Sequence, residues 1–208
     1  MSRRRRPRRT LTALVALGIA SRANYQVQDG DTLSGIAARH GTSVDALASA
    51  NGIADPDRIL AGQLLRLPDA AAAERTPAQT EVGDLIEQVA REHGWSPAFV
   101  KGLAWQQSGW NNTRISSAGA IGIMQVMPGT GDFISRELVG RELDLRDPHD
   151  NVLAGVVFLQ YLWESTDGDV ERTLAGYYQG LRSVSQHGMY PSTERYIANV
   201  LALRERFR

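Results

Sequence analysis

The sequence predicts an α+β protein in which a small βααβ module precedes a predominantly α-helical domain. Three observations support this fold class. Residues 25–68 contain two short strand patterns that flank two short helix patterns, with turn residues between them. Residues 69–79 are rich in alanine and have no apolar periodicity, which is typical of a linker. After residue 80, apolar residues recur at helical spacing and no strand pattern of comparable strength appears.

The N-terminal module is punctuated by glycine and by helix-capping residues. Either Asp31 or Thr32 is suited to cap the first helix, and Gly41 follows that helix at its C-terminal end. Ser43 is placed to cap the second helix. The elements expected in order are a strand over Tyr25–Gln28, a helix ending at His40, a helix over Val44–Asn51 and a strand over Leu64–Leu67.

The C-terminal domain, residues 80–208, has repeated helix-start signals. Ser96-Pro97 and Asp147-Pro148 each combine a capping residue with proline at the first helical position. The predicted helices are one that carries Leu85 and Val89 and ends at Gly94, one from Pro97 to near Gln107, one over Gly131–Val139 capped by Thr130, one beginning at Pro148, one over Asp169–Tyr178 and one from about Ser192.

The N-terminus predicts an export signal in residues 1–23. Arg3–Arg9 is strongly basic, Leu11–Ala20 is apolar, and small residues flank a cleavage site near Ala23. Ten apolar residues are too few for the roughly 20 of a membrane span, so no stable span is expected. A basic arm that binds anionic lipid is one alternative, and an intracellular basic arm that binds nucleic acid is another. The rest of the chain argues against nucleic-acid binding, because 23 − 7 = 16 basic residues there oppose 23 acidic ones.

Residues 25–68, reading YQVQDGDTLSGIAARHGTSVDALASANGI and later ILAGQLLRLP, resemble a LysM module over its full length. The resemblance implies binding of glycans that contain N-acetylglucosamine. It places the sugar groove between two loops, whose residues here are Gly30, Asp31, Thr32, Leu33, Asp57, Arg58 and Ile59. The alternative for the apolar members of this region is that they form the core of a very small domain.

The stretch Leu103–Pro128, LAWQQSGWNNTRISSAGAIGIMQVMP, resembles the catalytic core of the lysozyme-like lytic transglycosylases, which cleave peptidoglycan glycan strands. In that family a glutamate precedes the Ser-Gly pair, and Gln107 stands in its place. The family's single carboxylic acid protonates the leaving oxygen, then acts as base while the muramic acid 6-hydroxyl attacks C1. The product is a 1,6-anhydro sugar.

Gln107 cannot act as a general acid, because its amide does not ionise in the working pH range. General acid–base catalysis typically contributes ~10²–10⁴-fold, so the chain is expected to be severely impaired. Three alternatives remain: a purely glycan-binding protein, an active enzyme that uses another carboxylate such as Glu92 or Asp132, and an unrelated all-α protein in which Gln107 is an ordinary polar residue.

The resemblance also implies a set of substrate-binding residues. These are Ser108, Gly119, Met124, Gln125, Tyr177, Tyr178 and Tyr196. Tyr178 replaces an asparagine of the family's pattern. Met127 is expected to fill the core, and Asn151 is expected to be structural.

No metal or cofactor is expected. The chain has no cysteine, and its four histidines have no ligand spacing. The expected partners are peptidoglycan and other glycan strands containing N-acetylglucosamine, with no nucleic acid. The protein is expected to be a secreted, cell-wall-associated bacterial monomer.

Overall fold

The structure is a computed structural model that describes residues 24–40, 42, 44–55, 58–68 and 77–208. In the N-terminal module, β1 (Asn24–Gln26) pairs antiparallel with β2 (Leu64–Arg66), and Tyr25 lies opposite Leu65. Helices α1 (Leu33–Arg39) and α2 (Val44–Asn51) lie between the two strands in the chain. Both strands are shorter than the expected ones, but the βααβ order is as predicted.

Thr32, rather than Asp31, caps helix α1. The Thr32 hydroxyl accepts a hydrogen bond from the backbone N–H of Gly35 at 3.1 Å. The Asp31 carboxylate instead accepts bonds from the N–H of Gln28 and the hydroxyl of Tyr25, and it pairs with Arg39. Asp31 therefore closes the turn before the helix. The expected roles of Gly41 and Ser43 fall outside the described residues.

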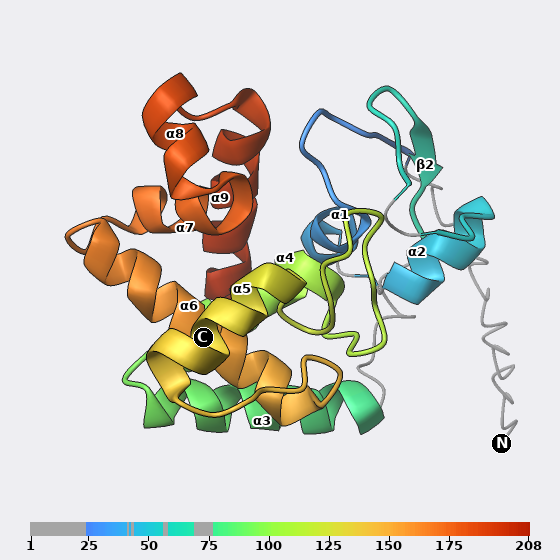
Figure 1. Cartoon of the computed structure of the whole chain (residues 1–208). Coiled ribbons are helices and arrows are strands. Elements are labelled where there is room, and N and C mark those ends of the chain that lie inside the picture. Colours follow the sequence, from blue (N-terminus) through green and yellow to red (C-terminus); the bar gives the residue numbers. More distant parts are fainter. Residues whose placement is uncertain (1–23, 41, 43, 56–57, 69–76) are drawn as a thin grey trace, which may run out of the picture.

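The C-terminal domain is helical, as predicted (Figure 1). Its elements are α3 (Pro77–Glu92), α4 (Pro97–Ser108), α5 (Pro128–Phe133), the π-helix η2 (Ile134–Val139), α6 (Pro148–Ser165), α7 (Val170–Gln179), α8 (Leu181–His187) and α9 (Pro191–Arg206).

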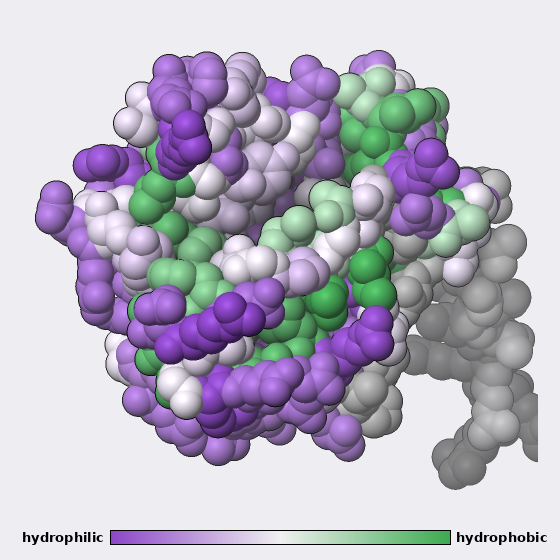
Figure 2. Space-filling view, viewed as in Figure 1, coloured by the Kyte–Doolittle hydropathy of each residue, from purple (hydrophilic) through white to green (hydrophobic). Residues whose placement is uncertain are grey.

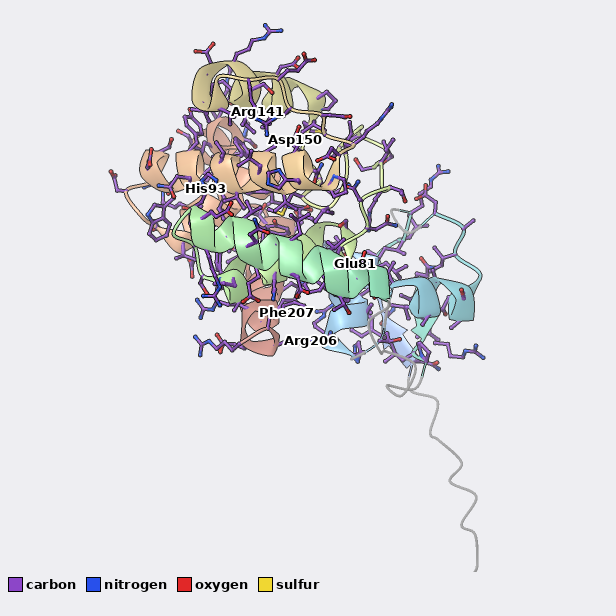
Figure 3. The ribbon with its side chains drawn as sticks, turned by 90° about the horizontal axis from the view of Figure 1, so that it is seen from below. Glu81, His93, Arg141, Asp150, Arg206 and Phe207 are labelled. Carbon is purple, nitrogen blue, oxygen red and sulfur yellow. The ribbon has the colours of Figure 1, made fainter. Side chains whose placement is uncertain are left out.

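Helix α4 is the centre of this domain. It packs against α3 on one side and α9 on the other, and most of its residues are buried, including Leu103 and Trp105. The C-terminal Phe207 stacks on Trp110 with ring centroids 5.0 Å apart, and Figure 3 shows Phe207 near the end of the chain. Phe207 thus packs against the C-terminal end of α4.

Three local expectations are corrected. The helix expected from Thr130 begins at Pro128, because Met127 adopts the extended N-cap conformation and proline occupies the first helical position. Its second half, Ile134–Val139, is a π-helix that ends at Gly140 in the left-handed conformation. Helix α3 begins at Pro77, so the last residues of the expected linker are helical. Helix α8 was not predicted.

The two parts of the chain pack directly on each other. Helix α1 of the N-terminal module contacts both α4 and α9, as Figure 1 indicates. Within the described residues, no helix is both long enough and apolar enough to cross a membrane.

Candidate functional site

Gln107 lies in the last turn of α4, where the chain leaves the helix. Gly109 follows with φ 67°, and its N–H bonds to the carbonyl of Trp105, so the helix ends in a left-handed cap. The Gln107 side chain is half-buried, between the helical core and the surface. This placement at a helix end is the one that the resemblance implied.

The side chain of Gln107 makes a hydrogen bond to the hydroxyl of Tyr196 on α9, with Nε2 donating at 2.7 Å. Tyr196 is only 1% exposed. Burial raises the pKa of Tyr196 well above its ordinary value, and the neighbouring Tyr177 and Tyr178 add to the increase. The phenol is therefore neutral, and its oxygen accepts from the amide.

Tyr178 covers one face of the Tyr196 ring. The two rings are stacked, with centroids 4.5 Å apart and planes inclined by 17°. Tyr178 is 41% exposed, whereas Tyr196 is covered. An aromatic surface thus faces solvent directly above the side chain that binds Gln107.

Ser108 does not point toward a ligand. Its hydroxyl donates to the carbonyl of Ile123 at 2.8 Å and accepts from the N–H of Asn111 at 3.0 Å, and the residue is 2% exposed. The contact holds the end of α4 against the following loop. Ser108 was expected to bind the catalytic side chain or the sugar, and in the structure its hydrogen bonds go to the backbone.

The loop over residues 111–127 contains residues with positive φ and is held by hydrogen bonds from a side chain to the backbone. Gln125 has φ 50°, rare for a residue other than glycine, and its amide donates to the carbonyls of Gly122 and Arg114. Gly119 has φ 90°, also in the region that favours glycine. The side-chain amide of Gln125 was expected to contact the saccharide. In the structure it instead holds the loop through hydrogen bonds to two backbone carbonyls.

Met124 is fully buried. A Cβ on Gly155 of α6 would lie 2.5 Å from the Met124 side chain, so the glycine makes room for the methionine. The Met124 N–H donates to Oδ1 of Asn151, and its carbonyl accepts from the Tyr177 hydroxyl at 3.0 Å. Met124 was expected to bind substrate, but its side chain fills the core and its backbone groups bond to Asn151 and Tyr177.

A pocket of about 230 Å³ adjoins the aromatic pair. It is lined by Gln125, Val126, Met127, Thr130, Phe158, Gly176, Tyr177, Tyr178, Gln179 and Gly180. Figure 2 shows the surface hollowed between the lobe formed by α7, α8 and α9 and the part that carries α1 and α2.

Met127 lines this pocket and is 43% exposed, so the expectation that it fills the core is wrong. The physical reason is that Met127 precedes α5 as its N-cap residue and has no helix face to bury. Thr130 and Phe158 also line the pocket and were not predicted.

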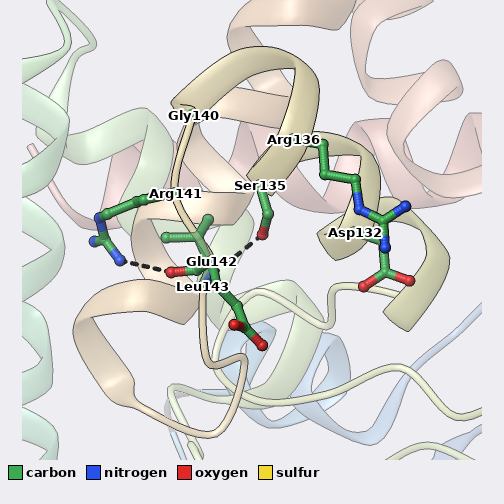
Figure 4. Close-up of a pocket in the computed structure, with 7 residues that line it drawn as sticks. All are labelled: Asp132, Ser135, Arg136, Gly140, Arg141, Glu142 and Leu143. Atoms are coloured by element: carbon green, nitrogen blue, oxygen red, sulfur yellow. Dashed lines mark hydrogen bonds between the residues drawn. The ribbon is translucent and has the colours of Figure 1, made fainter.

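The described lining of this pocket contains no carboxylate. Asp132 lies instead with Ser135, Arg136, Arg141 and Glu142 around a separate pocket of about 480 Å³ (Figure 4). Glu92 accepts from Gln88 on the exposed surface of α3. Neither acid that was considered as a substitute shares the pocket beside Tyr178.

Three residues of types that can bind a metal ion lie together at the start of α6. Asp147, His149 and Asp150 each place a donor atom within 4.8 Å of the others. Asp147 caps α6 through the N–H of Asp150, and Asp150 pairs with Arg141, as Figure 3 shows. The hydrogen bond from Arg141 lowers the pKa of Asp150. Both carboxylates thus already have structural partners.

The residues expected to bind sugar in the N-terminal module differ in accessibility. Leu33 has no exposed surface and belongs to the module's core with Ile36 and Leu47. The Asp31 carboxylate is covered by its partners, and Gly30 faces Ser192 of α9. Arg58 is exposed and Ile59 half-buried, while Asp57 lies outside the described residues. Leu33 offers no surface to a glycan in this arrangement.

Comparison with known proteins decides the family. The model of the transglycosylase SLT domain matches residues 84–199. The chain belongs to this family. The LysM domain model matches residues 25–68, so a LysM module precedes the SLT domain.

Curated relatives match each part separately. Membrane-bound lytic murein transglycosylase C of Mannheimia succiniciproducens is 30% identical over 129 residues, which cover 56% of this chain and 36% of that protein. N-acetylmuramoyl-L-alanine amidase XlyB of Bacillus subtilis is 51% identical over 59 residues, 28% of this chain and 19% of the relative. The chain therefore spans well under half of the length of either protein.

Solved structures share the fold. The soluble lytic transglycosylase SLT70 of Escherichia coli has a TM-score of 0.55 and 26% identity, covering 60% of this chain and 24% of that one. An inactive glutamate-to-glutamine mutant of lytic transglycosylase Slt from Pseudomonas aeruginosa has a TM-score of 0.61 and 22% identity, with coverage of 87% and 30%. The lysozyme-like helical fold predicted from the sequence is confirmed.

Proposed function

We propose that this protein binds peptidoglycan glycan strands in the SLT cleft and cleaves them very slowly, because Gln107 occupies the general-acid position. Lytic transglycosylases cleave the bond between N-acetylmuramic acid and N-acetylglucosamine and form a 1,6-anhydro product. One observation carries the proposal. The amide of Gln107 binds Tyr196 at the end of α4, and the described residues around the adjoining pocket include no carboxylate to replace it.

Retention of glycan binding follows from the shape of the site. Glutamine and glutamate have nearly the same volume, and the exposed ring of Tyr178 beside the pocket suits the apolar face of a sugar ring. The LysM module supplies a second glycan-binding surface, for which Arg58 and Ile59 are the accessible candidates. Residues 1–23 serve as the export signal in this proposal, and the mature protein acts at the cell wall as a monomer.

The chain as written and its Gln107→Glu variant test the proposal directly. Both are incubated with purified peptidoglycan, and soluble products are separated and weighed by mass spectrometry. We expect the variant to release 1,6-anhydro products at least ~10² times faster, the scale of general acid catalysis. Equal activity of the two forms would instead indicate another carboxylate as the acid.

A purely glycan-binding protein is the second candidate. The specific observation in its favour is Tyr178, which stands where the family's pattern has asparagine and now covers Tyr196. If Gln107→Glu is folded and binds glycan but releases no product, this candidate is correct. The double variant Gln107→Glu/Tyr178→Asn then shows whether Tyr178 is the remaining obstacle.

A further inference from the structure

The LysM module makes a close contact with the helix that carries Gln107. The hydroxyl of Ser34, on α1, donates to the backbone carbonyl of Gln106 at 2.7 Å, and the side-chain amide of Gln106 donates to the Thr32 hydroxyl at 2.9 Å. Ser34 is 0% exposed and Gln106 is 1% exposed. The Ser34 bond is buried and the Thr32 bond is partly buried, and they join residues 72 and 74 positions apart in the sequence.

The Ser34 bond completes the end of helix α4. The last four carbonyls of an α-helix lack partners within the helix. The N–H of Gly109 satisfies the carbonyl of Trp105, and the hydroxyl of Ser34 satisfies the next carbonyl, that of Gln106. The LysM module therefore supplies a capping group to the residue immediately before Gln107.

Glycines allow the two modules to approach at backbone distance. A Cβ on Gly35 would lie 2.6 Å from Oε1 of Gln106, and a Cβ on Gly30 would lie 2.6 Å from Cα of Ser192. On the other side of the interface, a Cβ on Gly109 would lie 2.9 Å from the Val44 side chain. A side chain at any of these positions requires its neighbour to shift: side chains at Gly35 and Gly109, but the backbone of Ser192 at Gly30.

The same module contacts the neighbours of Tyr196. Gly30 faces Ser192, Gly35 lies close to Asn199, and Asp29 is 4.0 Å from Arg195. The module thus contacts both α4, which carries Gln107, and α9, which carries its partner Tyr196. Figure 1 shows α1 next to α4.

We infer that the LysM module positions the Gln107–Tyr196 pair, with Ser34 as the positioning residue, and is a fixed part of the SLT site rather than only a tethered glycan anchor. Ser34 holds the end of α4, while the loop that contains Gly30 holds the start of α9. The groove segment Gly30–Leu33 is engaged in this contact or in the module's core, so the accessible glycan surface of the module lies toward Arg58 and Ile59.

Ser34→Ala tests the positioning role, and Ser49→Ala on the exposed side of α2 is its matched control. The full chain is labelled with ¹⁵N, and solvent exchange of the Gln107 side-chain amide is measured by NMR. We expect exchange to accelerate about fivefold in Ser34→Ala, the factor for losing one net hydrogen bond, and to be unchanged in Ser49→Ala. Unchanged exchange in both variants would overturn the inference.

Gly35→Leu tests the rigid attachment, with Ser49→Leu as control. The parent protein is expected to unfold in one thermal transition, and Gly35→Leu in two, because the modules are forced apart. Two transitions in the parent would contradict a fixed module. If Gly35→Leu does not fold, the Ser34→Ala exchange measurement decides.

Activity provides a third readout in the Gln107→Glu background. Adding Ser34→Ala is expected to lower kcat with little change in KM, since the glycan contacts are intact and only the placement of residue 107 changes. A rise in KM at constant kcat would contradict positioning. If Gln107→Glu is inactive, the proposed function fails, while the exchange measurement on the parent chain still tests this inference.

Discussion

The ring of Tyr178 on α7 lies almost parallel to the ring of Tyr196 on α9, with 4.5 Å between centroids. Tyr196 is buried and accepts the hydrogen bond from Gln107, whereas Tyr178 is partly open to solvent. The pair therefore connects Gln107 to an exposed aromatic surface. An asparagine at position 178, the residue expected there from the resemblance, would have no ring to cover Tyr196.

Tyr178→Ala is expected to weaken glycan binding about three- to tenfold, since it removes the aromatic face next to the pocket. Calorimetry with N-acetylglucosamine tetramer measures the affinity. Tyr190→Ala is the control, because Tyr190 is 44% exposed but does not line the pocket. An equal loss of affinity in the two variants would mean that Tyr178 has no specific role.

Tyr196→Phe in the Gln107→Glu background is expected to shift the alkaline limb of the pH–rate profile upward. The raised pKa of Tyr196 keeps its hydroxyl protonated, so it donates to a carboxylate at position 107 and stabilises the charged form. Removing that donor raises the carboxyl pKa, and the acid stays protonated to higher pH. The measurement is kcat/KM as a function of pH. A shift of the alkaline limb to lower pH would contradict this geometry.

Asn151→Ala is expected to lower the free energy of unfolding by about 3 kcal/mol, because it removes the side chain that bonds to the buried N–H of Met124 and to the carbonyl of Leu145. The Asn151 amide donates to the carbonyls of Ile121 and Leu145 and accepts from the N–H of Met124, and the residue is 0% exposed. Chemical denaturation measures the effect. Gln160→Ala on the same helix should change stability by less than about 0.5 kcal/mol, and an equally small effect of Asn151→Ala would refute its structural role.

Glu87→Gln is expected to lower the melting temperature at pH 7 and to have progressively less effect below pH 4.5. Hydrogen bonds from Lys101 and then Arg91 lower the pKa of Glu87 from its ordinary 4.5 to about 2. A lowered pKa in the folded state gives stability that is complete above pH 4.5 and is lost as pH falls toward 2. Thermal melts of both proteins from pH 2 to 7 measure it. A difference that does not vary with pH would exclude the ion pair as the cause.

Much of the fold follows from local sequence signals. Asp147 caps α6 as Asp147-Pro148 predicts, and Gly109 ends α4 beside Gln107. The flanking residues alone also led to the prediction that Gln107 stands at the general-acid position, and that assignment stays a prediction. These features depend on neighbours within a few positions along the chain, so they can be predicted from short stretches of sequence.

The tertiary structure decided what each predicted side chain does. Ser108 and Gln125 bind backbone carbonyls, Met124 is buried against Gly155, and Met127 reaches the pocket. A polar residue in a loop has several partners within reach, and only the folded chain determines which one it binds.

The sequence by itself determined the two modules and the order of most of their elements, and it led to the prediction that Gln107 stands in place of a carboxylic acid. Only the tertiary structure decided that the Gln107 amide donates to the Tyr196 hydroxyl. It also decided that Ser34 of the LysM module bonds to the backbone carbonyl of Gln106, in the last turn of α4. The residues of the first pair are 89 positions apart and those of the second are 72 apart, so no local sequence pattern predicts either contact. Their meeting depends on how α1 and α9 pack against α4, and that packing is set by shape and burial across the whole molecule.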